Sequence, residues 1–297
     1  MLRIHTGWLG LGVLLSSASG AIASTSVPRL DHVIVVIMEN KSYDEVRTEP
    51  YIATLISQGT AFTNSYAIAH PSLPNYLSLW AGSTLGDTSD TCPPPGSPYT
   101  VENLGHACEA AGMSWRSYAE NLPSAGSTVC SADSQLYTRK HDPWTDFLNL
   151  DHQNERPYPD LALDLAQGTL PKLAFIIPNN FDNMHNSNAD QGDAWLSRNL
   201  PALLPALGPQ GMLVLTWDED NERSGNHILT VFIGPPVKQR YEHSGAINHF
   251  TVLRAVCESL GLAPFAGAAG EPSLADIWVP LTAARAPSWG SIMTSYR

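Results

Sequence analysis

Oxygen-bearing side chains follow directly after two apolar runs of this sequence of 297 residues. After HVIVVIM stand Glu39 and Asn40, and after GMLVLTW stand Asp218, Glu219 and Asp220. Carboxylate and amide oxygens are the ligands that hard divalent cations such as Mg²⁺, Ca²⁺ and Mn²⁺ prefer. A lone acidic run more often solvates a loop, so the argument depends on the pairing of the two groups. If the two apolar runs lie side by side, these residues can hold one cation between them.

A serine stands where an apolar helix is expected to begin. In HPSLPNYLSLWAG, Ser72 precedes a helix predicted over residues 73–81, with Pro74 in its first turn. The simpler interpretation is an N-cap, because serine is preferred at that position. The functional interpretation uses the same geometry, since a helix N-terminus stabilises a phosphate or a serine alkoxide. A coordinated cation could activate the hydroxyl as a nucleophile.

Two histidines and a lysine lie in polar, irregular sequence. Lys140 and His141 stand in YTRKHDPW, and His185 stands in the polar segment that follows the apolar run KLAFII. Loop histidines are usually solvated, but beside a bound phosphate they can hold a phosphoryl oxygen or protonate a leaving alcohol. A lysine there can neutralise phosphate charge. His249 stands where a helix begins, so a capping or supporting role competes evenly with catalysis, and His227 is a weaker candidate.

The elements that must position these residues alternate between strands and helices. We expect strands at HVIVVIM, SWRSYA, KLAFIIP, GMLVLTW and ILTVFIG. We expect helices over 50–58, 73–81, 101–111 and 250–260, and one from about residue 190 that Pro201 and Pro205 break. Residues 83–100 and 121–160 are predicted to be irregular. This alternation predicts an α/β domain with a mostly parallel central sheet, helices on both faces, and ligands at the carboxyl ends of the strands.

The first 23 residues are predicted to form a secretory signal peptide. Arg3 precedes an apolar stretch from Trp8 to about Leu15, and small residues lead to an A-x-A pattern that ends at Ala23. An N-terminal membrane anchor is the alternative, although the apolar stretch is short for a bilayer span. Residues 24–297 would then form one secreted or periplasmic domain without a transmembrane segment.

The charge balance limits the partners of the chain. It has 16 Lys and Arg against 28 Asp and Glu, which gives a formal net charge of −12 at pH 7. Nucleic acid is excluded as the main partner, because phosphate-backbone binding needs clustered basic residues. With 43% hydrophobic and 15% charged residues, the chain is also too apolar for intrinsic disorder. A phosphorylated substrate remains compatible with the acidity, since a bound metal can supply positive charge.

The sequence contains four cysteines, Cys92, Cys108, Cys130 and Cys257, and export would bring them into an oxidising compartment. Four cysteines allow three pairings, and spacing alone does not choose between them. Cys92 and Cys130 lie in loop-like sequence, whereas Cys108 and Cys257 lie in helix-like stretches and could equally be buried thiols. No C-x-x-C occurs, which argues against a zinc site.

Five segments resemble, in order, the bacterial phosphoesterase family that contains acid phosphatases and non-haemolytic phospholipases C. They are MENKSYDEV, HPSLPNYLSLWAG, RKHDPW, DNMHNSNADQGDAWL and LVLTWDED. The chain is most similar to the short secreted branch of acid phosphatases, which includes a mycobacterial enzyme acting on phosphatidylinositol 3-phosphate. The resemblance covers Asp31 to about Leu262. It implies an alkaline-phosphatase-like α/β fold and a metal-assisted mechanism through a phosphoserine.

The resemblance also implies roles for individual residues. The implied metal ligands are Glu39, Asn40, Ser72, Asp218 and Glu219. The implied nucleophile is Ser72, the second catalytic residue is His185, and the substrate-binding residues are His141, Lys140 and Asn75. The run Asn183-Met184-His185-Asn186-Ser187 departs from the D-M-H-D-G pattern of the branch, and the loss of a carboxylate beside His185 could change the orientation or the pKa of that histidine. Cys92–Cys130 becomes the preferred disulfide, because the branch has this pair.

Together these features predict a secreted, metal-dependent phosphomonoesterase, with a membrane phosphoinositide as a candidate substrate. The main alternative is a phosphodiesterase of the phospholipase C type that uses the same site, although the chain is short for that group. A non-catalytic secreted protein that binds lipid or metal is the other alternative. The complete set of Glu39, Asn40, Ser72 and Asp218 argues against it.

Overall fold

The computed structural model describes residues 27–280, so the predicted signal peptide, 1–23, lies outside the described residues. The strands are β1 (His32–Met38), β2 (Gly59–Tyr66), β3 (Trp115–Ala119), β4 (Ser131–Ala132), β5 (Tyr137–Thr138), β6 (Glu155–Pro157), β7 (Leu173–Ile177), β8 (Gly211–Trp217), β9 (His227–Ile233), β10 (Tyr241–His243) and β11 (Ile247–Asn248). The α-helices are α1 (Tyr43–Val46), α2 (Pro50–Gln58), α3 (Ser72–Ala81), α4 (Leu104–Ala110), α5 (Pro159–Gln167), α6 (Ala189–Ala206) and α7 (His249–Leu260). Short 3₁₀ turns cover Asp133–Gln135, Arg139–His141, Pro143–Asp146, His152–Asn154 and Ala266–Gly270.

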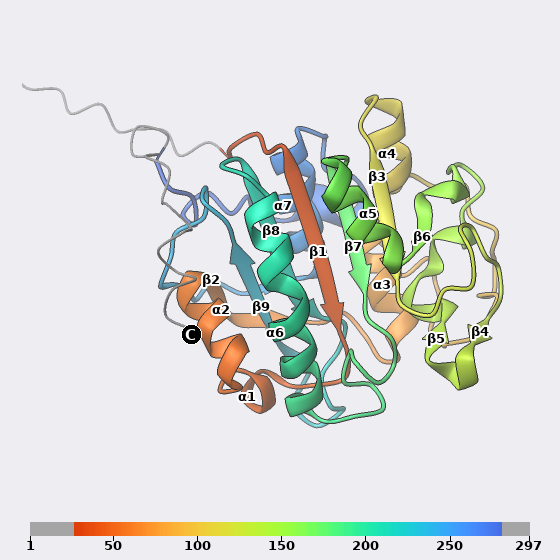
Figure 1. The fold of residues 1–297 in the computed structure, drawn as a ribbon, viewed down its shortest axis with the longest axis horizontal. Coiled ribbons are helices and arrows are strands. Elements are labelled where there is room, and N and C mark those ends of the chain that lie inside the picture. The colour runs from red at the N-terminus through yellow and green to blue at the C-terminus, as the bar shows by residue number, and fades with distance from the viewer. Residues whose placement is uncertain (1–26, 281–297) are drawn as a thin grey trace, which may run out of the picture.

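The strands form a mixed central sheet (Figure 1). Within the described chain it has nine strands in the order β10-β2-β9-β8-β1-β7-β3-β6, and β11 also pairs with β2. Every pair in this sheet is parallel except those of β9, which runs antiparallel to both β8 and β2. The expected α/β fold with a mostly parallel sheet is confirmed.

Strand β1 lies at the centre of the sheet and pairs in parallel with β7 and β8. Its alternate side chains point to opposite faces, and both faces are buried, which explains its continuous apolar sequence. Val33, Val35 and Ile37 belong to a core that includes residues of α3, α4 and α7. Ile34 and Val36 belong to a second core with residues of α2, α5 and α6. In Figure 1, α5 and α6 cross in front of the sheet and α7 lies behind it.

Helix α6 continues through Pro201 and Pro205, so the prediction that these prolines break it is wrong. It runs for 18 residues, Ala189–Ala206, with both prolines inside. A proline removes a helix hydrogen bond and crowds the preceding turn. The apolar face of the helix offsets this cost, because Leu196 and Leu200 are buried in the core beneath it.

Other boundaries differ from prediction for local reasons. The helix expected over 101–111 begins only at Leu104, because the side chain of Asn103 caps it by accepting a 2.9 Å hydrogen bond from the backbone N–H of His106. Strand β2 has no counterpart among the predicted strands, since its sequence GTAFTNSY is largely polar. Its buried hydroxyls find partners far along the chain, as Ser65 does with Thr230 at 2.8 Å. Within residues 27–280 we find no helix with the length and apolarity that a bilayer crossing requires.

Cys92 and Cys130 form a disulfide, as the resemblance implies. In the described chain Cys108 and Cys257 are buried thiols, and burial raises the pKa of each to about 12. The disulfide joins the irregular segment after α3 to the segment that enters the β4–β5 ribbon. It therefore connects two loops near the predicted site. One follows the helix that begins at Ser72, and the other precedes Lys140.

The double variant Cys92→Ser/Cys130→Ser is expected to lower the free energy of unfolding by about 2–4 kcal/mol. The bridge spans 38 residues of sequence, so its loss gives the unfolded chain more conformational freedom. Thermal denaturation of the variant and of the oxidised wild type measures the effect. Reduced wild type serves as the control and should melt with the variant. Equal melting temperatures for the variant and the oxidised protein would contradict the prediction.

Candidate active site

Glu39 and Asp218 meet at the carboxyl ends of β1 and β8. Met38 and Trp217 are register partners, so the residues that follow them leave neighbouring strands at the same level. The backbone N–H of Asp218 donates to the carbonyl oxygen of Met38 at 2.9 Å, and that of Asn40 donates to Asp218 Oδ1 at 3.2 Å. Both carboxylates are fully buried. The structure thus places the two oxygen-bearing groups together.

Two buried oxygens of this group, Asn40 Oδ1 and Asp218 Oδ2, have no hydrogen-bond partner among the described residues. Buried polar atoms are usually paired, so both oxygens are available to a bound ligand. Asn40 has a left-handed backbone (φ 54°), which asparagine tolerates better than most residues. An amide oxygen and carboxylates without partners fit a hard divalent cation.

Ser72 is the first residue of α3 rather than its N-cap, which is Pro71. Its Oγ is buried and donates to Glu39 Oε2 at 3.3 Å. Tyr76 follows one turn later on the same face, and its hydroxyl donates to the other carboxylate oxygen, Glu39 Oε1. The helix therefore presents two hydroxyl groups to one carboxylate. Tyr76 is absent from the predicted site residues, although its i, i+4 spacing from Ser72 is a usable signal.

Burial raises the pKa values of the carboxyl groups in the site. Burial, followed by the charge of Asp218, holds the pKa of Glu39 well above its usual range. Burial raises the pKa of Asp218 to about 6. Burial and then the charge of Asp218 raise the pKa of Glu219 to about 9. Negatively charged carboxylates repel one another in a buried site, and a bound proton or cation relieves this repulsion. The raised pKa values are therefore also what a metal site would show before the metal binds.

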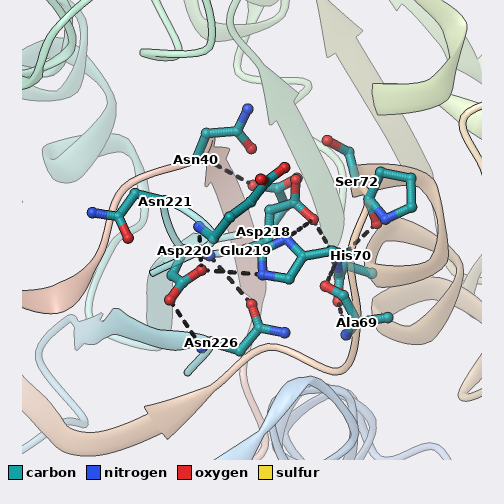
Figure 2. A network of polar contacts seen from close by, with 12 residues as sticks. Asn40, Ala69, His70, Ser72, Asp218, Glu219, Asp220, Asn221 and Asn226 are labelled. Atoms are coloured by element: carbon teal, nitrogen blue, oxygen red, sulfur yellow. Dashed lines mark hydrogen bonds and ion pairs between the residues drawn. The ribbon is translucent and has the colours of Figure 1, made fainter. Parts of the chain in front are cut away.

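His70 holds the acidic segment after β8 against the turn that leads into α3. Its ring lies between Glu219 and Asp220, with Nδ1 3.0 Å from Glu219 Oε2 and Nε2 3.1 Å from Asp220 Oδ1 (Figure 2). Asp220 also accepts hydrogen bonds from three backbone amides within residues 222–226. The predicted ligand Glu219 is therefore oriented by His70. His70 is not among the predicted site residues, and its only signal in the sequence is its place two residues before Ser72.

The side chain of Asn75 braces the turn before Ser72. Its Oδ1 accepts hydrogen bonds from the backbone amides of Ile68 and Ala69, both at 3.0 Å. Its Nδ2 donates to the carbonyl oxygen of Ala69 at 2.9 Å and lies 3.4 Å from Glu219 Oε2. The residue is fully buried. These contacts occupy the amide, so in this structure Asn75 positions the turn and Glu219.

His141, His185 and Lys140 lie together beside Glu39. His141 Nε2 is 3.3 Å from Glu39 Oε1 but makes no hydrogen bond within the described chain. The rings of His141 and His185 are 5.4 Å apart between centroids, and Lys140 Nζ is 3.4 Å from His185 Nε2. Glu39, His141 and His185 each offer a ligand atom within 4.8 Å of the others, so this group could also hold a metal ion.

Both of these histidines favour the neutral form. Burial first, and then the positive charge of Lys140, lowers the pKa of His141 well below its usual range. Burial also lowers the pKa of His185. The Nδ1 of His185 lies 2.7 Å from Asn186 Oδ1, which assigns the ring proton to Nδ1 and leaves Nε2 as an acceptor. The asparagine that departs from the family pattern therefore still orients the ring.

His249 supports the site from behind. It is the first residue of α7, it is fully buried, and its Nε2 donates to the backbone carbonyl of Asp218 at 2.6 Å. Burial lowers its pKa to about 4, so the neutral imidazole makes this bond. Of the roles weighed for His249, the structure shows the supporting one. His227 instead stacks on Tyr43, with ring centroids 4.7 Å apart.

Solved structures share this fold at low sequence identity. A protein of the alkaline phosphatase superfamily from Vibrio parahaemolyticus has a TM-score of 0.61 at 11% identity, covering 84% of this chain and 72% of that one. A lipoteichoic acid synthase from Listeria monocytogenes has a TM-score of 0.55 at 11% identity, covering 84% and 76%. At these identities the likeness shows the fold alone, which is alkaline-phosphatase-like, as the resemblance implies.

Relatives found by sequence similarity show the family as well as the fold. The chain is 37% identical over 289 residues to a phosphatidylinositol-3-phosphatase of Mycobacterium tuberculosis, covering 93% of this chain and 95% of that protein. It is 28% identical over 243 residues to an acid phosphatase of Aspergillus fumigatus, covering 76% of this chain but only 54% of that protein. Residues 45–263 match the Phosphoesterase family. The chain therefore belongs to the Phosphoesterase family and is a hydrolase of phosphoester bonds.

Proposed function

We propose that this protein is a secreted, metal-dependent phosphomonoesterase that works through a phosphoserine intermediate. One observation carries the proposal: Ser72 Oγ lies 3.3 Å from Glu39 Oε2, at the start of α3 and inside a buried group of carboxylates. The positive end of a helix favours negative charge on an oxygen at this position. The Ser72 hydroxyl is buried beside carboxylates, and its hydrogen bond to Glu39 joins it to this acidic group.

The proposed reaction gives each of these side chains a part. The Ser72 hydroxyl gives up its proton as its Oγ forms a bond to phosphorus and the ester P–O bond breaks, and the departing alcohol takes up a proton, so that the number of protons is conserved. His185 is our candidate for the group that supplies this proton or holds a phosphoryl oxygen, and for either role its Nε2, an acceptor in this structure, must first take up a proton. Lys140 and His141 bind the phosphoryl oxygens. Water then cleaves the phosphoserine and restores the Ser72 hydroxyl.

A divalent cation of the Mg²⁺, Ca²⁺ or Mn²⁺ type is the proposed cofactor. Its ligands would be Glu39, Asn40, Ser72, Asp218 and Glu219, and the unpartnered oxygens of Asn40 and Asp218 support this set. When bound, the cation would supply Lewis-acid stabilisation of negative charge on oxygen. Without it, the net negative charge of the site would repel a phosphate.

The proposed substrate class is phosphoinositides such as phosphatidylinositol 3-phosphate. The support is the relative of that activity, which is 37% identical across 93% of this chain. We also propose that residues 1–23 direct export and that residues 24–297 form one domain. The disulfide between Cys92 and Cys130 supports an oxidising compartment.

The mature protein is expected to hydrolyse p-nitrophenyl phosphate with a kcat/KM at least about tenfold above that for bis(p-nitrophenyl) phosphate. It should also release inorganic phosphate from a short-chain phosphatidylinositol 3-phosphate. A preference for the diester would favour the phosphodiesterase alternative. Cation binding without hydrolysis of either compound would favour a non-catalytic binding protein.

A further inference from the structure

The carboxylate of Asp90 joins the start of the serine-bearing helix to the lysine of the site. Its Oδ1 accepts a hydrogen bond from the backbone N–H of Leu73 at 3.0 Å, and its Oδ2 accepts one from Lys140 Nζ at 2.6 Å. Leu73 directly follows Ser72, and Lys140 directly precedes His141. The side chains of Lys140 and Asp90 are only 16% and 28% exposed. This ion pair is therefore better shielded from water than an ordinary surface pair.

The two segments that carry this ion pair are covalently joined. Asp90 stands two residues before Cys92, which is bonded to Cys130. The backbone carbonyl of Cys130 accepts a 3.0 Å hydrogen bond from the N–H of Arg139, the neighbour of Lys140. The disulfide and this bond hold the loop of Asp90 beside the 3₁₀ turn of Lys140. The contact is thus built into the loop structure rather than made by two freely mobile side chains.

The ammonium group of Lys140 has hydrogen-bond capacity left for a ligand. It has three N–H donors, of which Asp90 takes one, and His185 Nε2 lies within reach at 3.4 Å. The same ammonium interacts electrostatically with the carboxylates of Glu39 and Asp218. Of these three carboxylates, Asp90 is the one that accepts a hydrogen bond from the ammonium.

We propose that Asp90 is a positioning residue of the phosphate site, which holds the Lys140 ammonium beside His185 so that it can donate to the phosphoryl group. The inference rests on the proposed function, in which Lys140 binds the phosphoryl oxygens. With a neutral residue at position 90, the ammonium loses the partner that fixes its position, and a phosphate has to order it on binding. Phosphate binding then weakens, whereas the attack by Ser72 on bound substrate changes less.

Asp90→Asn separates the ion pair from the contact with the helix, because an amide oxygen can still accept from Leu73 N–H. The KM for p-nitrophenyl phosphate and the inhibition constant of inorganic phosphate are expected to rise about tenfold, with kcat within about threefold of wild type. Asp133→Asn is the matched control, since it makes the same change at an exposed position three residues after Cys130, the other cysteine of the disulfide. It should leave both constants unchanged. Wild-type constants in Asp90→Asn would overturn the proposal.

A double-mutant cycle with Lys140→Ala distinguishes positioning from a structural role. In the Lys140→Ala background, Asp90→Asn is expected to change KM by less than about twofold, because its partner is gone. An effect of undiminished size in that background would show that Asp90 acts through the start of α3, and the proposal would fall.

Calorimetric titration of inorganic phosphate into the same variants tests the inference without catalysis. Weaker phosphate binding by Asp90→Asn supports it even if the wild type hydrolyses no phosphomonoester, in which case the proposed function alone fails. Equal phosphate affinities, or no phosphate binding by the wild type, overturn the positioning role whatever the activity.

Discussion

Ser72→Ala is expected to lower kcat on p-nitrophenyl phosphate by about 10³-fold or more, because it removes the attacking oxygen. The Oγ of Ser72 contacts Glu39 at the start of α3, and Tyr76, whose hydroxyl contacts the same carboxylate, follows one turn later. Alanine suits a helix, so the variant should fold and melt close to wild type. Steady-state kinetics with added Mg²⁺, together with thermal denaturation, measures both effects.

Ser78→Ala is the matched control for the loss of a buried hydroxyl from the same helix. Ser78 is fully buried in α3, and its Oγ donates to the carbonyl oxygen of Pro74 at 2.7 Å, away from the carboxylates. Its kcat should stay within about threefold of wild type. A Ser72→Ala enzyme that keeps more than about a tenth of the wild-type turnover would rule out the phosphoserine mechanism.

Asp218→Asn is expected to remove tight cation binding and to lower kcat/KM by about 10²-fold or more. In the absence of cation the same change should raise stability or leave it unchanged, because it relieves repulsion between two buried carboxylates. In wild type, saturating Mg²⁺ at about 100 times its Kd should stabilise the fold by about 2.7 kcal/mol, and the variant should lack this gain. Elemental analysis and melting curves with chelator or Mg²⁺ report the two effects separately.

Glu222→Gln is the control for this variant, since Glu222 is an exposed acidic residue on the same loop as Glu219. It should keep the wild-type metal content and the wild-type response to Mg²⁺. An Asp218→Asn protein that also keeps both would show that the cation, if there is one, binds elsewhere, for example at Glu39, His141 and His185.

Acidification is expected to weaken cation binding to the wild type. The pKa of Asp218 is raised to about 6 by burial, and that of Glu39 is held well above its usual range by burial and by Asp218. Below these values each carboxyl carries a proton that the cation must displace, so the apparent Kd rises as pH falls, by up to about tenfold per pH unit for each proton. The Mg²⁺ concentration for half-maximal activity, measured from pH 8 to pH 5, should increase. A constant value would contradict this ligand set.

The strands that end in the site are the part of the fold most readable from local pattern. β1 and β8 are buried on both faces, so their sequences are nearly uninterrupted apolar runs, and Glu39 and Asp218 directly follow the ends of these strands. Strand β2 is the opposite case, because its polar side chains are satisfied only by distant partners such as Thr230. Pro201 and Pro205 led to the wrong prediction of a broken helix for a similar reason. The packing of α6 on the sheet outweighs the tendency of proline to interrupt a helix.

The residues that support the site were harder to predict from sequence patterns than the candidate metal ligands. His70, Tyr76 and Asp90 orient Glu219, Glu39 and Lys140, respectively. Each acts on a residue that lies between 37 and 149 positions away in the sequence. Contacts across such separations depend on how loops cross the end of the sheet. The hydrophobic periodicity of the sequence does not predict the paths of these loops.

The sequence by itself determined the α/β class, the oxygen-bearing strand ends and the serine before an apolar helix. These follow from burial and helix geometry, which act over a few residues. Only the tertiary structure decided that β1 and β8 are neighbours, that Ser72 opens α3 facing Glu39, and that Glu219 turns to His70. Strand order and loop paths are set by long-range packing, so the same oxygen donors become a site only when the sheet brings them together.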